Sequence, residues 1–371
     1  MDKKPEFLFG KTNVGGNNPC FIIAEIGINF DGKFSQALEL IDVAAKAGCN
    51  AVKFQLFTAE RMYAKKAGLF KTAGGRKKDI IDIVKEGELP PLWIPKLKAY
   101  ANKKGLEFFS TVCDEQSGDI LEKYSVDAYK FASYEITHLP LFRYVVRKGK
   151  PIVFSSGGST LKEVAGVMEL LEQEGCQDIL LNHCQGQYPP TIDTLNLNVL
   201  TTFQLAFPRT VIGFSDNGSD PSLDVAGAVV ALGAKAYEVH ITLDRNLPGP
   251  DHSFALNPKE LSDTVARIRK TEKNMGEGKR TSIDSRMLGT SERRTYPGEA
   301  YVRQFAYRCV FTKKAIKKGE KFSKNNLAVL RPGKNTRGLE PKYYTLLLKG
   351  YRAIRDIAEN KSIQWEDILL T

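Results

Sequence analysis

The chain has 371 residues, of which 42% are hydrophobic and 26% are charged, and its formal net charge is +11. This is the composition of an ordinary globular protein, and the length suffices for a full α/β barrel with a smaller second domain. No apolar run approaches the roughly 20 residues that cross a bilayer, and residues 1–10 lack the apolar core of a signal peptide. We therefore expect a cytoplasmic protein without a membrane segment.

The basic residues are dispersed in pairs and short clusters such as Arg76-Lys77-Lys78. No helix-turn-helix or RNA-binding pattern accompanies them. An enzyme that binds anionic substrates can carry the same excess of positive charge. We therefore expect no nucleic-acid partner, and we interpret most of these side chains as solvated surface.

Six cysteines occur, and no two of them form a C-x-x-C pair. Several lie inside apolar, strand-like segments, which is typical of reduced and buried thiols in a cytosolic chain. They are Cys20, Cys49, Cys113, Cys176, Cys184 and Cys309.

Eight short apolar segments recur between residues 20 and 241. Amphipathic stretches separate most of them; in residues 34–47, for example, Ala37, Leu38 and Ile41 recur at helical spacing. Eight strand–helix units over about 270 residues predict a (β/α)8 TIM barrel. The expected strands are Cys20–Ile26, Ala51–Gln55, Glu107–Ser110, Ala128–Ala132, Pro151–Ser155, Ile179–His183, Thr210–Phe214 and Ala236–Ile241.

The rest of the chain divides at changes of composition. We assign residues 1–275 to the barrel, and within it the long connection 64–91 is expected to be an active-site loop or lid. Residues 276–300 are polar and contain Gly and Pro, which is typical of a linker. Residues 301–371 hold short strand-like pieces and predict a small, β-rich C-terminal domain.

Polar side chains follow the expected strands at the points where they end. Because the carboxyl ends of barrel strands meet on one face, these side chains should converge. Two of them, Lys53 and Lys130, are lysines within apolar strands, where an unpaired charge is costly. With serines and threonines nearby they would bind a phosphate or carboxylate, and ion pairs with Glu25 or Glu238 are the alternative.

Further polar groups lie on neighbouring strand ends. Asn217, His240, Asp251 and His252 could converge on one metal or substrate. The Gly157-Gly158 pair offers backbone N–H groups to an anion, although the same pair is also typical of a simple turn. His138 lies at the expected start of a helix, and we interpret it as structural.

Motifs at these strand ends resemble the sialic acid synthase family, in order along the whole barrel. The residues that carry the resemblance are Ile23-Ala24-Glu25-Ile26-Gly27-Ile28-Asn29, Val52-Lys53-Phe54-Gln55, Phe109-Ser110-Thr111, Tyr129-Lys130-Phe131-Ala132-Ser133-Tyr134-Glu135, Ile212-Gly213-Phe214-Ser215-Asp216, His240-Ile241-Thr242-Leu243-Asp244 and Gly249-Pro250-Asp251-His252. The tail, residues 310–369, resembles the antifreeze-like (SAF) domain that ends these synthases. Members condense phosphoenolpyruvate with an N-acetylated amino-hexose, such as N-acetylmannosamine, to form nonulosonic acids.

The resemblance implies roles for individual residues. Phosphoenolpyruvate would be held by Lys53, Thr111, Lys130, Ser133, Ser155 and Ser215, with Gln55 also on the substrate. Glu25 and Glu135 would position or activate reacting groups, together with the two lysines, and Tyr188 and Asp251 would contact the sugar. His240 and Asn217 would hold a divalent Mn²⁺ or Mg²⁺ ion that polarises the sugar aldehyde. Arg331 would reach the amino sugar in a partner subunit's site, which implies a domain-swapped homodimer.

The sequence departs from the family pattern at four places. Phe30 and Asn217 each replace a histidine, Val112-Cys113 replaces Pro-Phe, and Gly186 replaces a sugar-contacting asparagine. An amide oxygen is a weaker ligand than imidazole. Three possibilities follow: a weak metal site completed by water, condensation without metal, or lost activity. The changes at Phe30 and Gly186 predict an altered sugar pocket.

Two other functions stay open. One is a synthase that joins phosphoenolpyruvate to a phosphorylated aldose, favoured if Arg76-Lys77-Lys78 face the site. The other is a non-catalytic paralogue that binds sugar or phosphate.

Overall fold

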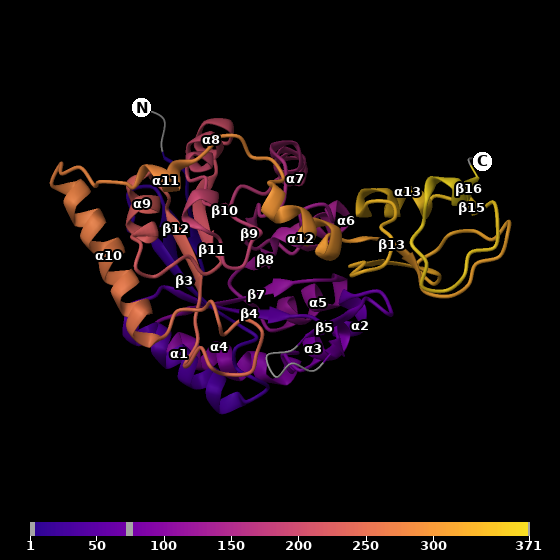
Figure 1. The fold of residues 1–371 in the computed structure, drawn as a ribbon, viewed down its shortest axis with the longest axis horizontal. Helices are drawn as coiled ribbons and strands as arrows, with labels where there is room; N and C mark the ends of the chain where they lie inside the picture. Colours follow the sequence, from indigo (N-terminus) through magenta and orange to yellow (C-terminus); the bar gives the residue numbers. More distant parts are fainter. Residues whose placement is uncertain (1–3, 72–76, 370–371) are drawn as a thin grey trace.

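Eight parallel strands form a closed barrel in the computed structural model, which describes residues 4–71 and 77–369 (Figure 1). The last strand of the barrel pairs with the first, so no edge is left open. This confirms the predicted TIM barrel. In order around the barrel, the strands are β3 (Phe21–Gly27), β4 (Ala51–Leu56), β7 (Glu107–Val112), β8 (Tyr129–Phe131), β9 (Ile152–Ser155), β10 (Ile179–Cys184), β11 (Val211–Asp216) and β12 (Ala236–His240).

Helices surround the barrel and pack on the outward-facing residues of its strands, such as Ile22 and Val52. Local signals set their ends. Asn257, for example, accepts a hydrogen bond from the Glu260 N–H and caps a helix whose first residue is Pro258. The helices are α1 (Phe34–Ala47), α4 (Ile94–Lys103), α5 (Glu115–Lys123), α6 (Leu139–Val146), α7 (Leu161–Gln173), α8 (Asn198–Ala206), α9 (Val225–Ala231) and α10 (Pro258–Gly276).

The barrel interior has an apolar lower half and a polar upper half. A hairpin of β1 (Glu6–Phe9) and β2 (Thr12–Gly15), which the sequence analysis did not identify, covers the lower end. There the Phe9 ring lies 4.9 Å from that of Phe21. Because strand side chains alternate between the two faces, the interior residue two positions after Phe21 is Ile23, and the next is Glu25. The polar layer therefore stands directly on an apolar one.

The expected lid has secondary structure of its own. It contains a short hairpin of β5 (Leu69–Lys71) and β6 (Lys77–Asp79), followed by α3 (Ile80–Lys85). The short helix α2 (Ala59–Met62) lies just before it. Arg76 of the basic cluster lies outside the described residues. A 3-10 turn, η1 (Pro91–Trp93), then leads into α4.

The segment interpreted as a linker packs closely on the barrel. It contains α11 (Ser285–Leu288) and η4 (Pro297–Glu299), and the helix α12 (Ala300–Ala306) begins at its last residue. Its residues Arg293 and Glu299 are 2% and 1% exposed, respectively. The backbone carbonyl of Arg293 also accepts a hydrogen bond from the N–H of Leu161, at the start of α7. The segment is therefore part of the barrel's upper face rather than a free tether.

A small domain follows and lies at one side of the barrel (Figure 1). Its two antiparallel sheets pair β13 (Cys309–Thr312) with β14 (Leu327–Leu330) and β15 (Arg352–Ala353) with β16 (Ile368–Leu369). Val310, Phe322 and Ile363 belong to its own apolar core. The remaining elements are η5 (Pro341–Tyr343), α13 (Tyr344–Leu347) and η6 (Trp365–Asp367). This confirms the predicted C-terminal domain.

The small domain and the lid are joined through their backbones. Arg331 donates its N–H to the carbonyl of Met62 and accepts from the N–H of Ala64 through its own carbonyl. Two residues later, Gly333 has a φ of +61°, and a Cβ there would lie 2.3 Å from the Ala67 oxygen. Only glycine fits this close approach.

Two expectations from composition can be compared with the described residues. All six cysteines are free, and all except Cys176 are buried. No helix in the described part of the chain has the length and apolar character needed to cross a membrane.

His138 has the structural role expected from the sequence. Its Nδ1 accepts a hydrogen bond from the Leu141 N–H and caps α6. Burial, aided by the nearby Arg308 guanidinium, lowers the pKa of His138 from 6.5 to about 3. The ring therefore stays neutral in the folded chain at pH values where it is protonated in the unfolded chain.

This difference predicts a loss of stability in acid. The contribution is fully present above pH 6.5, and it is lost as the pH falls toward 3 because only the unfolded state takes up the proton. His138→Asn keeps a capping acceptor and removes the ionisable ring. Between about pH 7.5 and pH 5.5, its unfolding free energy should fall by about 1.4 kcal/mol less than that of the wild type.

Urea unfolding at the two pH values measures this difference. Gln173→Ala, a change at an exposed and uncharged position, is the control and should follow the wild type. An unchanged pH dependence in His138→Asn would show that the ring titrates alike in both states.

Candidate active site

A cavity of about 350 Å³ lies at the carboxyl ends of the barrel strands. This is the end at which (β/α)8 enzymes carry their active sites. Its lining includes every residue to which the family resemblance assigns a role except Glu135: Glu25, Lys53, Gln55, Thr111, Lys130, Ser133, Ser155, Tyr188, Ser215, Asn217, His240, Asp251 and Arg331.

Two buried lysines meet at one carboxylate on the floor of this cavity. The Lys130 ammonium lies 3.0 Å from Glu238 Oε2, and the Lys53 ammonium lies 3.4 Å from Glu238 Oε1. Lys53 also lies 2.8 Å from Glu25, which accepts a 2.7 Å hydrogen bond from Gln55. The predicted alternative, ion pairs with Glu25 or Glu238, is therefore observed in full. The four charged groups nevertheless all face the cavity.

The two carboxyl groups differ in their electrostatics. Burial opposes ionisation of Glu238, but the Lys130 and Lys53 ammonium groups outweigh it and lower its pKa to about 2. Burial raises the pKa of Glu25 and Glu238 adds a repulsive charge, and these effects outweigh the Lys53 ammonium and the Gln55 hydrogen bond, which lower it. Burial likewise lowers the pKa of Lys130. Glu238 is therefore a fixed anion, whereas Glu25 is suited to exchange a proton.

Hydroxyl groups lie around the lysines. Ser155 accepts a hydrogen bond from the Lys130 ammonium, and Thr111 Oγ1 lies 3.5 Å from Lys53 Nζ. Ser215 donates a 3.2 Å hydrogen bond to Glu238. Together they form a polar floor that can bind a small anion.

The residues predicted to hold a metal lie at one side of the cavity. Burial lowers the pKa of His240, so its ring is neutral, and its Nδ1 has no hydrogen-bond partner among the described residues. Asp251 Oδ2 lies 4.0 Å from this nitrogen. Asn217 donates its amide hydrogens to the Gln185 carbonyl and the Cys184 sulfur, which leaves its oxygen free to act as a ligand.

Several expectations about individual residues were wrong. His252 does not join this group, because its ring is fully buried and bonded to Thr242 and Asp31. Phe30 also lies outside the cavity and packs against Phe54 and Trp93. The replacements at Phe30 and Gly186 therefore do not alter the cavity wall directly.

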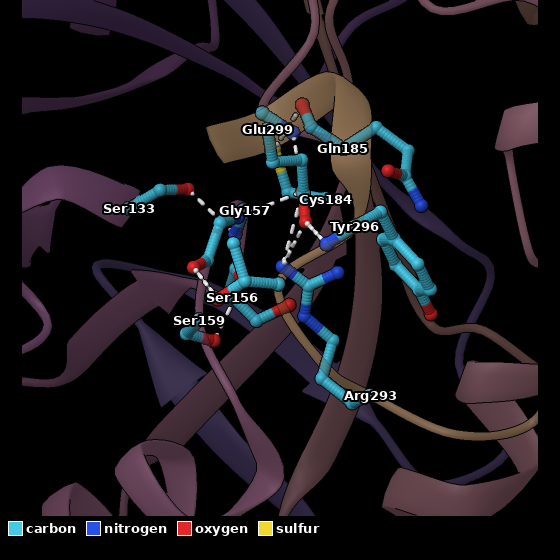
Figure 2. Close-up of polar contacts among 12 residues, drawn as sticks. Ser133, Ser156, Gly157, Ser159, Cys184, Gln185, Arg293, Tyr296 and Glu299 are labelled. Carbon is cyan, nitrogen blue, oxygen red and sulfur yellow. Dashed lines mark hydrogen bonds and ion pairs between the residues drawn. The ribbon is translucent and has the colours of Figure 1, made fainter. Parts of the chain in front are cut away.

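The N–H groups of Gly157 and Gly158 are not free for a substrate anion, contrary to the prediction. Gly157 donates to Ser133 Oγ at 2.9 Å (Figure 2). Gly158 donates to the Glu299 carboxylate at 2.7 Å. The sequence did not reveal this, because Glu299 lies 141 positions away in the interpreted linker.

Glu135 lies behind the cavity, where it binds two arginines. Its oxygens accept hydrogen bonds from Arg308 at 2.5 Å and Arg331 at 2.8 Å. Arg331 reaches the cavity of its own chain, and its guanidinium lies over the Tyr134 ring. Burial opposes ionisation of Glu135, but the two arginines lower its pKa. Glu135 therefore positions Arg331 and does not line the cavity.

The segment expected to be an active-site lid does cover the cavity, and it supplies part of an apolar wall. The lid contributes Ile80, Ile83 and Val84, and Met62 and Tyr63 come from the residues just before it. Helical spacing in α3 could have suggested one apolar face, but the sequence analysis did not name the residues that line the cavity. Lys77 and Lys78 are not part of the lining, and Lys78 pairs with Glu86.

Comparisons with known proteins agree with this arrangement. Residues 40–280 match the NeuB family, and residues 307–369 match the SAF domain. The spore coat polysaccharide biosynthesis protein SpsE of Bacillus subtilis is 48% identical over 98% of this chain and 97% of its own. Its crystal structure superposes with a TM-score of 0.89 and covers 99% of each chain at 46% identity.

Two further relatives are named as synthases. The N,N'-diacetyllegionaminic acid synthase of Campylobacter jejuni is 34% identical over 84% of this chain and 90% of its own. The N-acetylneuraminic acid (sialic acid) synthetase of Leptospira borgpetersenii superposes with a TM-score of 0.67 at 31% identity, covering 77% of this chain and 95% of that one.

The lysine pair predicts a strong dependence of stability on Glu238. Glu238→Gln would leave the Lys53 and Lys130 ammonium groups buried with only Glu25 to compensate both. We expect a loss of about 3–5 kcal/mol in unfolding free energy, the cost typical of removing one partner from a buried ion pair. Urea unfolding of Glu172→Gln, which breaks an exposed pair with Arg209, should show a loss below about 1 kcal/mol. Equal losses in the two variants would contradict the prediction.

Proposed function

Because the chain belongs to the NeuB family, the family of the sialic and related nonulosonic acid synthases, we propose that it condenses phosphoenolpyruvate with an N-acetylated amino-hexose. The reaction would release phosphate and form a nonulosonic acid. The observation that carries this proposal is the pair of buried lysines, Lys53 and Lys130, in a cavity at the active-site end of a TIM barrel. The names of the Campylobacter and Leptospira relatives support it.

Phosphoenolpyruvate would bind on the polar floor of the cavity. Its carboxylate and phosphate would be bound by Lys53 and Lys130 and by the hydroxyls of Thr111, Ser155 and Ser215. A bound anion would share the ammonium groups with Glu238 and Glu25. Since burial raises the pKa of Glu25, this carboxyl group can take up a proton when the anion enters.

The reaction consists of one bond formation and one hydrolysis. C3 of phosphoenolpyruvate attacks the sugar aldehyde carbon, and the aldehyde oxygen takes up a proton to become a hydroxyl. Water adds to C2 and loses one proton, which leaves a hydroxyl there. This hydroxyl loses its proton and becomes the C2 carbonyl as the C2–O bond to phosphate breaks, with the electron pair leaving on phosphate. Glu25 lies beside Lys53 and Gln55 in the cavity, and its raised pKa suits it to proton transfer in these steps.

A divalent cation, Mn²⁺ or Mg²⁺, would fit beside the aldehyde position. Within the described residues, no cluster of three or more His, Cys, Asp or Glu side chains could hold a metal. The neutral His240 ring, with its unpartnered Nδ1, and the Asn217 amide oxygen are two suitable donors. Such a site would be completed by water and substrate. When bound, the ion would act as a Lewis acid on the aldehyde oxygen.

The acceptor would lie between Tyr188, Asp251 and Arg331, against the apolar wall of the lid. This wall suits an acylated amino sugar better than a polyhydroxylated or phosphorylated one. The described lysines of the basic cluster, Lys77 and Lys78, lie outside the lining, so a phosphorylated aldose is not favoured.

We also propose the homodimer implied by the resemblance. In the single chain, Arg331 already lies in its own cavity and pairs with Glu135. Exchange of C-terminal domains between two chains would bring an equivalent arginine to the same position. Light scattering of the purified protein measures whether two chains associate.

The proposed activity predicts release of phosphate that requires both substrates. Purified protein would be given phosphoenolpyruvate with a panel of N-acyl hexosamines and aldose phosphates, with Mn²⁺ or with chelator. We expect release with an N-acyl amino sugar only, and complete loss in Lys130→Ala, because this change removes an ammonium group from the anion site. Lys162→Ala, an exchange on the outer helix α7, is the control. Release of phosphate in the absence of an acceptor, or no release of phosphate with any acceptor, would contradict the proposed synthase activity.

The metal proposal predicts a gain of affinity in Asn217→His. A second imidazole is a stronger ligand than an amide, and it would lie beside His240. Calorimetric titration with Mn²⁺ should show tighter binding, whereas Asn198→His on α8 should behave as the wild type. Unchanged affinity in Asn217→His would place residue 217 away from the metal.

A further inference from the structure

Glu299 makes a set of contacts that neither the family resemblance nor the proposed reaction explains. This carboxylate belongs to the segment between the two domains, yet it is buried at the upper face of the barrel. One of its oxygens, Oε1, accepts hydrogen bonds from the N–H groups of Gly158 and Gly186, both at 2.7 Å. The other oxygen accepts from the N–H of Tyr296 at 3.0 Å. Figure 2 shows the Glu299 side chain beside Tyr296 and Arg293.

The charge of Glu299 is compensated by Arg293. The Arg293 guanidinium donates to both carboxylate oxygens at 3.1 Å and lies over the Tyr296 ring. Both bonds come from its NH2 group, and its Nε and NH1 have no hydrogen-bond partner among the described residues. Arg293 and Glu299 therefore form a buried ion pair in which the two charges compensate each other.

The two glycines bound by Glu299 follow neighbouring strands. Gly158 follows β9, and Gly186 follows β10. The ends of these strands approach closely: a Cβ on Gly186 would lie 3.2 Å from the Gly158 nitrogen and 3.3 Å from Glu299 Oε1. A single oxygen atom therefore sets the distance between the two strand ends.

The rest of the Gly157-Gly158 backbone is bound by the same segment. The Gly157 carbonyl accepts from the Tyr307 hydroxyl at 2.7 Å, and the Gly158 carbonyl accepts from Thr295 and Arg303. Residues 293–307 thus bind the end of β9 at successive peptide groups. A strand end held in this way has little freedom to shift.

The two strand ends serve different halves of the cavity. β9 carries Ser155, the hydrogen-bond partner of Lys130 on the anion-binding floor. The end of β10 carries Gln185, whose carbonyl orients Asn217, and it leads to Tyr188 on the acceptor side. The distance between the ends therefore affects how the two substrates approach each other.

We propose that Glu299 is a positioning residue that holds the phosphoenolpyruvate half and the acceptor half of the cavity at reacting distance. The proposal rests on the proposed function. Lys53 and Lys130 do not depend on Glu299 for their contacts, so phosphoenolpyruvate alone binds without it. The rate of bond formation depends on it, because displacement of a reactant by about 1 Å costs on the order of 100-fold in rate.

The test is Glu299→Gln, which keeps the size of the side chain and removes its charge. We expect kcat to fall at least about 10-fold at saturating concentrations of both substrates. The dissociation constant of phosphoenolpyruvate, titrated calorimetrically without acceptor, should change by less than about threefold. Glu292→Gln, the same exchange at an exposed position of the same segment, is the matched control and should change neither value.

A second variant keeps the test independent of the buried charge. Gly186→Ala leaves Glu299 in place, and its φ is not in the left-handed region, but its Cβ would press on Gly158 and the carboxylate. It should lower kcat in the same direction while retaining affinity for phosphoenolpyruvate. Circular dichroism and urea unfolding give the folded fraction, to which kcat is normalised.

The outcomes separate this inference from the proposed function. If the wild type is active and both variants keep its kcat, the positioning role of Glu299 is overturned, whereas the proposed function stands. A loss of phosphoenolpyruvate affinity that parallels the loss of kcat also overturns it, because Glu299 would then serve only the anion site. A wild type that releases no phosphate with any acceptor ends the proposed function, and this inference with it.

Discussion

The site depends on one constraint, the need to compensate two ammonium groups that the barrel buries. Lys53 and Lys130 come from different strands, and both meet Glu238, which comes from a third. An isolated buried charge would cost several kcal/mol, so removal of Glu238 would leave Lys130 without its carboxylate and Lys53 with Glu25 alone. The same balance makes the cavity receptive to anions, because an entering carboxylate or phosphate finds donors already gathered. Glu25, with its raised pKa, is the group that can relieve the excess negative charge.

A second constraint comes from the C-terminal third of the chain. Two buried glutamates connect this part of the chain to the barrel, one from each side of the contact. Glu135 belongs to the barrel and binds Arg308 and Arg331 of the small domain, whereas Glu299 belongs to the connecting segment and binds the backbone of the barrel. The lid is joined to the same unit through the backbone of Arg331. The cavity is therefore complete only when the lid, the connecting segment and the small domain are all docked.

The sequence predicted the barrel and most of the cavity for a physical reason. Strand alternation is strictly two residues, so once Phe21 and Ile23 are read as interior, Glu25 must follow them into the barrel. Contacts without local periodicity were not predictable. The packing of Glu299 on Gly158, and the separation of Glu135 from the cavity by Arg331, depend on tertiary contacts between segments more than 100 positions apart. The hairpin over the lower end was missed because its strands are only four residues long.

Gly186 stands where the sialic acid synthase family has an asparagine, and the surroundings of this residue explain why a glycine fits there. A Cβ at this position would lie 3.2 Å from the Gly158 nitrogen and 3.3 Å from the Glu299 carboxylate. Glycine therefore lets the ends of β9 and β10 approach until one oxygen bonds both N–H groups. Residue 186 does not line the cavity, so it offers no contact to a bound molecule. In the proposed reaction, recognition of the acceptor would then depend on Arg331, Tyr188 and Asp251, and Arg331 is held by its ion pair with Glu135.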